Sequence, residues 1–172
     1  RDDGVVLVGL LLDAGEVALD GIIGPGHVST IIGSAAWDFL PREYGMACAI
    51  SGFEPLDLLS AIAGLVRAVE AGEPSVINAY ARGVRPQGNT VAQAMLARVF
   101  DVGEAEWRGF GPIPQSGLSL NAAFAAYDAR RRFPVGVQPR REPAGCRCGE
   151  VLRGMLAPDA CSFFRKVCSP RS

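Results

Sequence analysis

The stretch LDGIIGPGHVST, residues 19–30, decides the fold. Residues 19–23 form a short apolar run of the length expected for a buried strand, and the glycines and proline after it predict a turn. From residue 27 to about residue 40 apolar side chains recur at helical spacing, and Ser29 or Thr30 could cap the start of that helix. A strand followed by a turn and a helix is typical of a parallel α/β sheet.

The same pattern recurs on both sides of this stretch. Residues 5–10, 46–50 and 76–80 are short apolar runs that predict further strands. Pro55 suits the first turn of a helix that runs to about residue 70, where Gly72 and Pro74 would end it. We therefore expect an α/β fold with a Rossmann-like parallel sheet covered by helices.

The second half of the chain changes character. Residues 90–100 predict an amphipathic helix, residues 106–113 an extended segment, and residues 121–132 a helix with arginines at its C-terminal end. Beyond Phe133 the composition shifts to proline, arginine, glycine and cysteine. We expect an α/β domain over residues 1–132 and an irregular, Cys-rich, metal-binding segment over residues 133–172.

Composition and charge exclude several classes of protein. With 49% hydrophobic residues, 21 glycines and 12 prolines, the 172-residue chain is neither disordered nor membrane-spanning, and no apolar run reaches the roughly 18 residues of a bilayer helix. Residues 1–129 hold 7 basic and 15 acidic residues, a charge of −8, whereas residues 130–172 hold 10 basic and 3 acidic residues, a charge of +7. Few aromatic residues accompany the basic tail, so we expect no nucleic acid as a partner, and the lack of a long apolar run predicts no membrane partner. The chain opens with Arg1 and has no secretory signal, which favours a mature or truncated cytoplasmic protein.

Four cysteines lie in the last 27 positions: Cys146, Cys148, Cys161 and Cys168. Clustered thiolates select zinc or an iron–sulfur centre, and the alternative is a pair of disulfides in an oxidising compartment. The paired C-x-x-C knuckles of a zinc ribbon are missing, and two sulfurs of a C-x-C pair are too close to bind one cluster comfortably. Cys148 could then be a spare thiol or belong to a disulfide, and Cys48, in a predicted strand, is expected to be buried.

Two polar loops follow successive predicted strands. The first carries His27, the only histidine, which could transfer a proton, bind a metal or simply cap the turn. The second carries Glu54 and Asp57 at a helix start, where capping is the simplest role of a carboxylate. Because the carboxyl ends of parallel strands meet at one edge of a sheet, we expect both loops to line one cleft.

Five separate motifs in order resemble the HypD family of hydrogenase maturation factors. They are GPGHVSTIIG (24–33), GFEPLD (52–57), VRPQGN (84–89), EWRG (106–109) and CRCGEVLRG (146–154), continued by PDAC (158–161) and CSP (168–170). The resemblance is collinear from about Leu19 to the end of the chain. Family motifs C-G-G-H, G-P-G-C-P-V-C and P-x-G-x-C-M-V-S-S-E-G-x-C have no counterpart here, so we expect the chain to be a fragment.

The resemblance implies a role in assembling the Fe(CN)2CO group of [NiFe]-hydrogenases. Proteins of this family work with the small chaperone HypC, receive cyanide made by HypE and HypF, and carry a [4Fe-4S] cluster in the C-terminal segment. It implies an assembly scaffold with redox activity, rather than a conventional turnover enzyme. The essential thiols of the family fall in motifs without a counterpart, so no catalytic residue is assigned.

The resemblance also assigns candidate residues. His27, Ser29 and Thr30 would line one wall of the cleft, with Glu54 and Asp57 beside them to hold the iron, its ligands or a partner's tail. The cluster ligands expected in this chain are Cys146, Cys161 and Cys168, with Cys148 as second choice. Two alternatives remain, a structural zinc-binding interaction module and an anion-binding enzyme that acts through the His27 loop.

Overall fold

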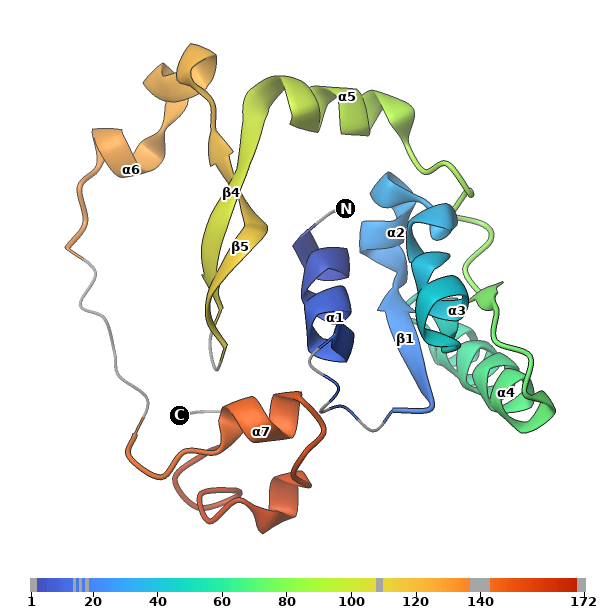
Figure 1. The fold of residues 1–172 in the computed structure, drawn as a ribbon. Coiled ribbons are helices and arrows are strands. Elements are labelled where there is room, and N and C mark those ends of the chain that lie inside the picture. The colour runs from blue at the N-terminus through green and yellow to red at the C-terminus, as the bar shows by residue number, and fades with distance from the viewer. Residues whose placement is uncertain are drawn as a thin grey trace. The chain divides into compact units, whose positions relative to one another are not determined.

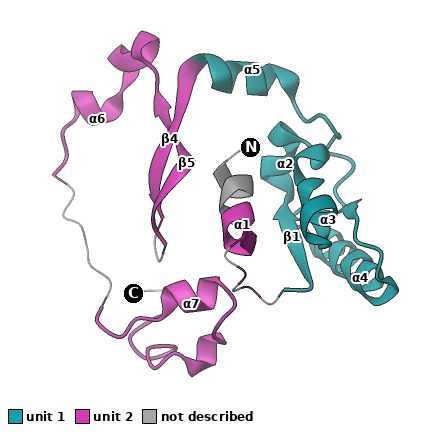
Figure 2. Cartoon of the chain, viewed as in Figure 1, with its two compact units in different colours: residues 1–6, 19–98 teal, residues 7–18, 99–172 magenta. Residues whose placement is uncertain are grey.

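The computed structural model describes residues 3–13, 15, 17, 19–107, 110–136 and 143–169. The chain forms two compact units, one made of Arg1–Val6 with Leu19–Arg98 and the other of Leu7–Ala18 with Val99–Ser172 (Figure 2). The sequence predicts that the cysteine-rich segment begins at residue 133, and this boundary stays a prediction.

The first unit contains a parallel sheet of three strands in the order β1 (Gly21–Pro25), β2 (Ala47–Ser51) and β3 (Val76–Asn78). The strands predicted over residues 19–23, 46–50 and 76–80 are therefore confirmed within two residues at each end. Every residue of β2 is buried, as expected for the middle strand of a parallel sheet. The predicted α/β class is confirmed.

One long helix packs against all three strands. Helix α4 (Pro55–Ala71) begins with the proline at its first turn and ends at Gly72, whose φ of +66° favours glycine. This element matches the prediction from the sequence. Its side chain at Ala61 joins a core that includes Leu40, Cys48 and Ile50, each fully buried.

The helix predicted over residues 27–40 is broken into three. It consists of α2 (Gly26–Ile32), the 3-10 turn η1 (Ser34–Trp37) and α3 (Phe39–Tyr44). The break lies at Gly33, whose φ is +89° and where a Cβ atom would lie 2.2 Å from the carbonyl oxygen of Pro86. The predicted capping by Ser29 or Thr30 is wrong, because Pro25 occupies the N-cap position and no side chain caps this helix.

Residues 5–10 are helical, so the strand predicted there is wrong. Helix α1 spans Asp3–Asp13 and contains the whole apolar run. A short continuous apolar run does not distinguish a strand from a buried helix by periodicity, and the 11-residue length of the element settles the assignment.

The second unit is dominated by an antiparallel hairpin of β4 (Phe100–Trp107) and β5 (Gly111–Leu120), which follows helix α5 (Thr90–Val99) (Figure 1). The predicted extended segment over residues 106–113 joins these strands, but the hairpin itself extends well beyond it. A β-bulge between Gly103 and Ala105 shifts the register of the pair.

Short elements follow the hairpin. The helix predicted over residues 121–132 is divided into η2 (Ala122–Tyr127) and α6 (Ala129–Arg132), because Asp128 accepts a capping hydrogen bond from the backbone N–H of Arg130. The cysteine-rich tail contains only α7 (Cys148–Leu152) and η3 (Pro158–Ala160) among its described residues. In the described part of the chain, no helix has the length and apolar character needed to cross a membrane.

Candidate functional site

The carboxyl ends of the three parallel strands meet at one edge of the sheet. Pro25 of β1 pairs with Ser51 of β2, and Ile50 of β2 pairs with Asn78 of β3. The segments that follow therefore leave the sheet side by side: the first turn of α2 after β1, and the loops after β2 and β3. The predicted first loop is thus helical from Gly26 onward. The imidazole of His27 lies 5.1 Å from the ring of Phe53 between ring centres, so the structure brings the start of α2 and the loop after β2 together.

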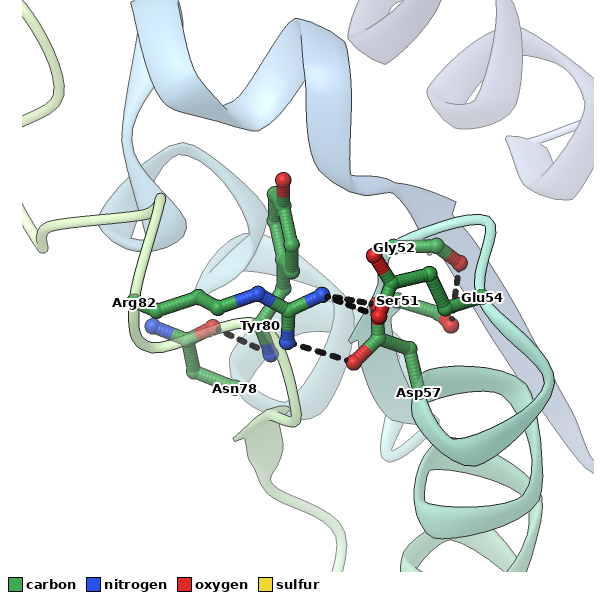
Figure 3. A network of polar contacts seen from close by, with 7 residues as sticks. All are labelled: Ser51, Gly52, Glu54, Asp57, Asn78, Tyr80 and Arg82. Carbon is green, nitrogen blue, oxygen red and sulfur yellow. Dashed lines mark hydrogen bonds and ion pairs between the residues drawn. The ribbon is translucent and has the colours of Figure 1, made fainter.

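Arg82, in the loop after β3, contacts both acidic residues at the start of α4, Glu54 at its N-cap and Asp57 in its first turn (Figure 3). Its Nη1 and Nη2 atoms each donate to one carboxylate oxygen of Asp57 at 2.6 Å, and Nη2 also donates to Glu54 Oε2 at 3.2 Å. The Asp57 side chain is 6% exposed, against 76% for Glu54 and 53% for Arg82. The cluster is thus a nearly buried carboxylate held by a half-exposed guanidinium, with a second carboxylate on the surface.

This ion pair changes the titration of both partners. Hydrogen bonds and positive charge from Arg82 hold the pKa of Asp57 below its ordinary value. The same bonds, with the charges of Asp57 and Glu54, raise the pKa of Arg82. Asp57 is therefore a permanent anion at neutral pH.

The Tyr80 ring lies close to the backbone of α2 at Gly26 and of the loop after β2 at Gly52. A Cβ atom on Gly26 would lie 2.8 Å from the Tyr80 ring, and one on Gly52 would lie 2.8 Å from the same ring and 2.1 Å from Asp57 Oδ2. Both glycines therefore allow the aromatic ring to approach the backbone. The guanidinium carbon of Arg82 lies 4.5 Å from the centre of this ring, in a cation–π contact.

The loop after β3 is closed by Asn78. Its Nδ2 group donates to the carbonyl oxygen of Val84 at 2.9 Å, and its Oδ1 atom accepts from the backbone N–H of Tyr80 at 3.1 Å. Neither Tyr80 nor Arg82 was identified from the sequence. A signal for both residues exists, because the segment around the end of the third predicted strand also reaches this edge of the sheet. The reasoning that selected His27, Glu54 and Asp57 therefore applies to it as well.

The remaining residues of the predicted cleft have different surroundings. The Ser29 hydroxyl is buried, donates to the carbonyl oxygen of Pro25 at 2.8 Å and accepts from the indole N–H of Trp37 at 3.0 Å. The Thr30 hydroxyl donates to the carbonyl oxygen of His27 at 2.7 Å. The His27 side chain is exposed, so it is the residue of the first loop that a ligand would meet.

This edge presents charge and an aromatic surface rather than a formed metal site. Among the described residues, no group of three or more histidine, cysteine, aspartate or glutamate side chains is placed to hold a metal ion. A surface pocket lies instead at the amino ends of the strands, where Leu19, Met46 and Pro74 contribute to its walls. The roles predicted for the cleft residues stay predictions.

In the tail, Cys161 has the surroundings of a thiolate. Hydrogen bonds from the backbone N–H groups of Phe163 and Arg147 lower the pKa of its thiol, with smaller contributions from the backbone of Phe164 and the charge of Arg147. Arg147 is itself held by Glu150, through Nε–H to Oε1 at 2.8 Å and a second bond from Nη2. Backbone donors to sulfur and a fixed nearby cation both favour an anionic, metal-binding sulfur.

Cys161 and Cys168 stand at the two ends of a closed loop. The backbone N–H of Phe164 donates to the carbonyl oxygen of Cys161, and that of Cys168 donates to the carbonyl oxygen of Phe163. Arg165 turns the chain with a φ of +58° and donates its N–H to the carbonyl oxygen of Cys168. These hydrogen bonds thus fix the backbone at Cys161 and at Cys168, two of the predicted cluster ligands.

The other cysteines divide into two kinds. Cys146 and Cys148 are partly exposed thiols, and Cys148 is the first residue of α7. Cys48 is fully buried in β2, and desolvation raises the pKa of its thiol to about 12, which confirms the prediction of a buried residue. All five cysteines are free thiols in this structure.

Comparison with known proteins places the chain in a family. A family model named HypD, described as "Hydrogenase formation hypA family", matches residues 5–172. This match includes residues before Leu19, which the sequence motifs alone did not connect with the family.

Curated relatives are similar over nearly the whole chain. The hydrogenase maturation factor HypD of Cupriavidus necator is 44% identical over 161 residues, which cover 93% of this chain and 42% of that protein. The proteins of the same name from Azotobacter vinelandii and Escherichia coli are 46% and 38% identical and are covered over 42% and 44% of their lengths. The chain spans about two fifths of the length of these relatives. Because the family model matches all but the first few residues, the chain belongs to the HypD family.

Proposed function

We propose that this chain acts in [NiFe]-hydrogenase maturation, as the part of a HypD-type scaffold that contains the sheet edge and the cysteine tail. The observation that carries this proposal is the family match, which spans both the loops at the sheet edge and the four cysteines of the tail. The similar proteins named above are hydrogenase maturation factors, which supports the same role for this chain. We propose that the chain acts in the cytoplasm.

The substrate in this proposal is the iron that becomes the Fe(CN)2CO group. The partners are a HypC-like small chaperone that helps to carry the iron and a HypE-like donor of cyanide. The exposed His27, Phe53 and Glu54 at the sheet edge support a contact with such cargo or with a partner's tail, because they offer an imidazole, an aromatic face and a carboxylate.

The proposed cofactor is a [4Fe-4S] cluster in the tail. Cys146, Cys161 and Cys168 would hold it, with Cys148 as second choice. The donor chemistry fits, because the surroundings of Cys161 favour a thiolate and its loop fixes Cys168. The described residues do not gather three of these sulfurs into one site. When bound, such a cluster supplies single electrons.

Anaerobic purification with analysis of iron, sulfide and zinc tests the cofactor. We expect roughly four irons and four sulfides per chain with an absorption band at roughly 400 nm. Cys161→Ser should lose both, because it removes the sulfur whose thiolate form the backbone stabilises. Ser162→Ala, at the exposed neighbouring position, is the matched control and should keep both.

Two results would contradict the cofactor assignment. One zinc per chain without colour would favour a structural zinc-binding module, since the same thiols suit zinc. Iron and sulfide that persist unchanged in Cys161→Ser would place the cluster on other residues.

A further inference from the structure

We infer that Arg82 is the positioning residue of the sheet edge: it holds together the three segments that follow the strands and keeps Asp57 from serving as a metal ligand. The inference rests on the proposed function only in taking this edge as the surface that meets cargo or partner. Its structural part stands on the geometry of the first unit alone.

The contact between Arg82 and Asp57 is of the kind that fixes orientation. Two parallel N–H···O bonds of 2.6 Å join the guanidinium to both carboxylate oxygens, across 25 residues of chain. A bidentate fork fixes the plane of both groups, which a lysine cannot do. Asp57 sits in the first turn of α4, so the bond ties the loop after β3 to that helix.

The same guanidinium also secures Tyr80. With Arg82 held over its ring, Tyr80 is held against the backbone at Gly26, the first residue of α2, and at Gly52, which begins the loop after β2. Gly83 is packed against this ring as well, since a Cβ there would lie 2.7 Å from it. One side chain therefore fixes the relative positions of the start of α2 and the loops after β2 and β3, including the contact between His27 and Phe53.

The arrangement also separates the roles of the two acidic residues. Both oxygens of Asp57 already accept hydrogen bonds from Arg82, and its side chain is nearly buried. Glu54 gives only Oε2 to Arg82 and is 76% exposed, so its other oxygen faces solvent. Of the two carboxylates predicted to hold iron, Glu54 is thus the one that a ligand can reach.

The ring protons of His27, the only histidine, provide a direct NMR readout of this positioning. The Phe53 ring at 5.1 Å shifts their resonances, and Phe53→Leu gives the reference without that ring. In Arg82→Gln and Arg82→Lys we expect the resonances to move toward the Phe53→Leu values. Arg85→Gln, in the same loop and with an exposed side chain, is the control and should leave them in place.

The two arginine variants separate charge from geometry. If Arg82→Lys keeps the wild-type resonances, charge alone suffices and the positioning role of the fork is wrong. Asp57→Asn breaks the same ion pair from its other side and should give the same shift of the His27 resonances. The double variant of Asp57→Asn with Arg82→Gln should show little further change. Circular dichroism of each variant verifies that the sheet is folded.

Anaerobic titration of the full chain with ferrous iron tests the role of Asp57. If Arg82 keeps Asp57 from binding metal, Asp57→Asn binds ferrous iron as wild type does, whereas Arg82→Gln, which frees both carboxylate oxygens of Asp57, binds it more tightly. Loss of iron binding in Asp57→Asn but not in Arg82→Gln would show that Asp57 is a ligand and overturn the inference. If no variant and no wild-type chain binds iron, the cargo proposal fails at this edge, while the His27 resonances still decide the positioning role.

Discussion

At the scale of single residues, both tryptophans use the same arrangement. The Trp37 indole N–H donates to Ser29, whose hydroxyl donates to a backbone carbonyl, and the Trp107 indole does the same through Ser116 and Ile113. Both serines are almost completely buried, at 0% and 2% exposure. A buried hydroxyl that donates and accepts leaves no polar group unsatisfied in either pair. The hydrogen bonds of Ser29 therefore stabilise the fold, in addition to the position in the cleft wall that its motif predicts.

The pKa of Asp57 gives a prediction about acid stability. Its carboxyl has a lower pKa in the folded chain than the roughly 3.9 of an unfolded chain, because Arg82 stabilises the anion. The unfolded chain therefore binds the proton more readily, and this contribution is complete above about pH 5 and is lost as the pH falls through the folded value. Urea unfolding at several pH values should show Asp57→Asn less stable than wild type at neutral pH, with the difference shrinking in acid.

Asp38→Asn is the control for this experiment. Asp38 is exposed and makes no capping hydrogen bond at the start of α3, so its substitution should leave the pH profile unchanged. A difference for Asp57→Asn that is constant from neutral pH to pH 3 would contradict the ion pair as the source of the shift.

At the scale of elements, the segment 85–89 is joined to the break between α2 and η1 by backbone bonds. Ser34 and Ala35 donate their N–H groups to the carbonyl oxygens of Arg85 and Pro86, each at 3.1 Å. Asn89 returns a bond from its N–H to the carbonyl oxygen of Ile31 at 2.9 Å. The RPQGN part of the family motif thus has a structural role, because it replaces the helical hydrogen bonds that Gly33 interrupts.

Gly88→Ala should strongly destabilise the first unit. Gly88 has a φ of +68°, and a Cβ atom there would lie 2.1 Å from the carbonyl oxygen of Ile31, a backbone atom that cannot move aside cheaply. The positive φ and the overpacking together should cost about 3 kcal/mol of unfolding free energy, measured by chemical denaturation. Gly72→Ala is the matched control, because its φ is +66° but its Cβ would have open space, so it should cost only about 1 kcal/mol. Equal losses in both variants would mean that the close approach contributes nothing.

The elements show which parts of the fold the sequence could predict. The strands around residues 21–25 and 47–51 are continuous apolar runs bounded by turn residues, and α4 carries both a start and an end signal. The β4–β5 hairpin was not foreseen, because Gly103, Pro112 and Pro114 interrupt the alternation that marks a strand. The pairing between β4 and β5, which includes a bulge, keeps these residues in strands, and this pairing exists only in the folded chain.

The site shows the same division. His27, Glu54 and Asp57 could be selected because they lie in the polar segments that come after two predicted strands, and the parallel order of the sheet brings such segments together. Arg82 could not be paired with Asp57 from the sequence, because the two lie 25 residues apart and only the folded sheet brings them together. The tail is least predictable, since its backbone bonds are local turns without a repeating pattern.

At the scale of the whole molecule, the two units contain different kinds of candidate site. The first unit presents carboxylate, imidazole and guanidinium groups at a sheet edge, whereas the second contains the thiols of the tail and most of the arginines. Oxygen and nitrogen ligands suit an iron cargo, and sulfur ligands suit a cluster, so the division matches the two tasks proposed for the chain.

The burial of Cys48 in the middle strand has a consequence for studying the chain as a whole. Cys48 is fully buried and its thiol has a pKa of about 12, whereas the other four cysteines are partly or fully exposed. A brief pulse of an alkylating reagent should therefore add four labels to native, metal-free chains, counted by intact mass spectrometry. The fifth label should appear only at the rate at which β2 leaves the sheet. A fifth label acquired together with the others would contradict the burial of this strand. The rate at which Cys48 is labelled thus reports the rate at which the sheet of the first unit opens, without an engineered probe.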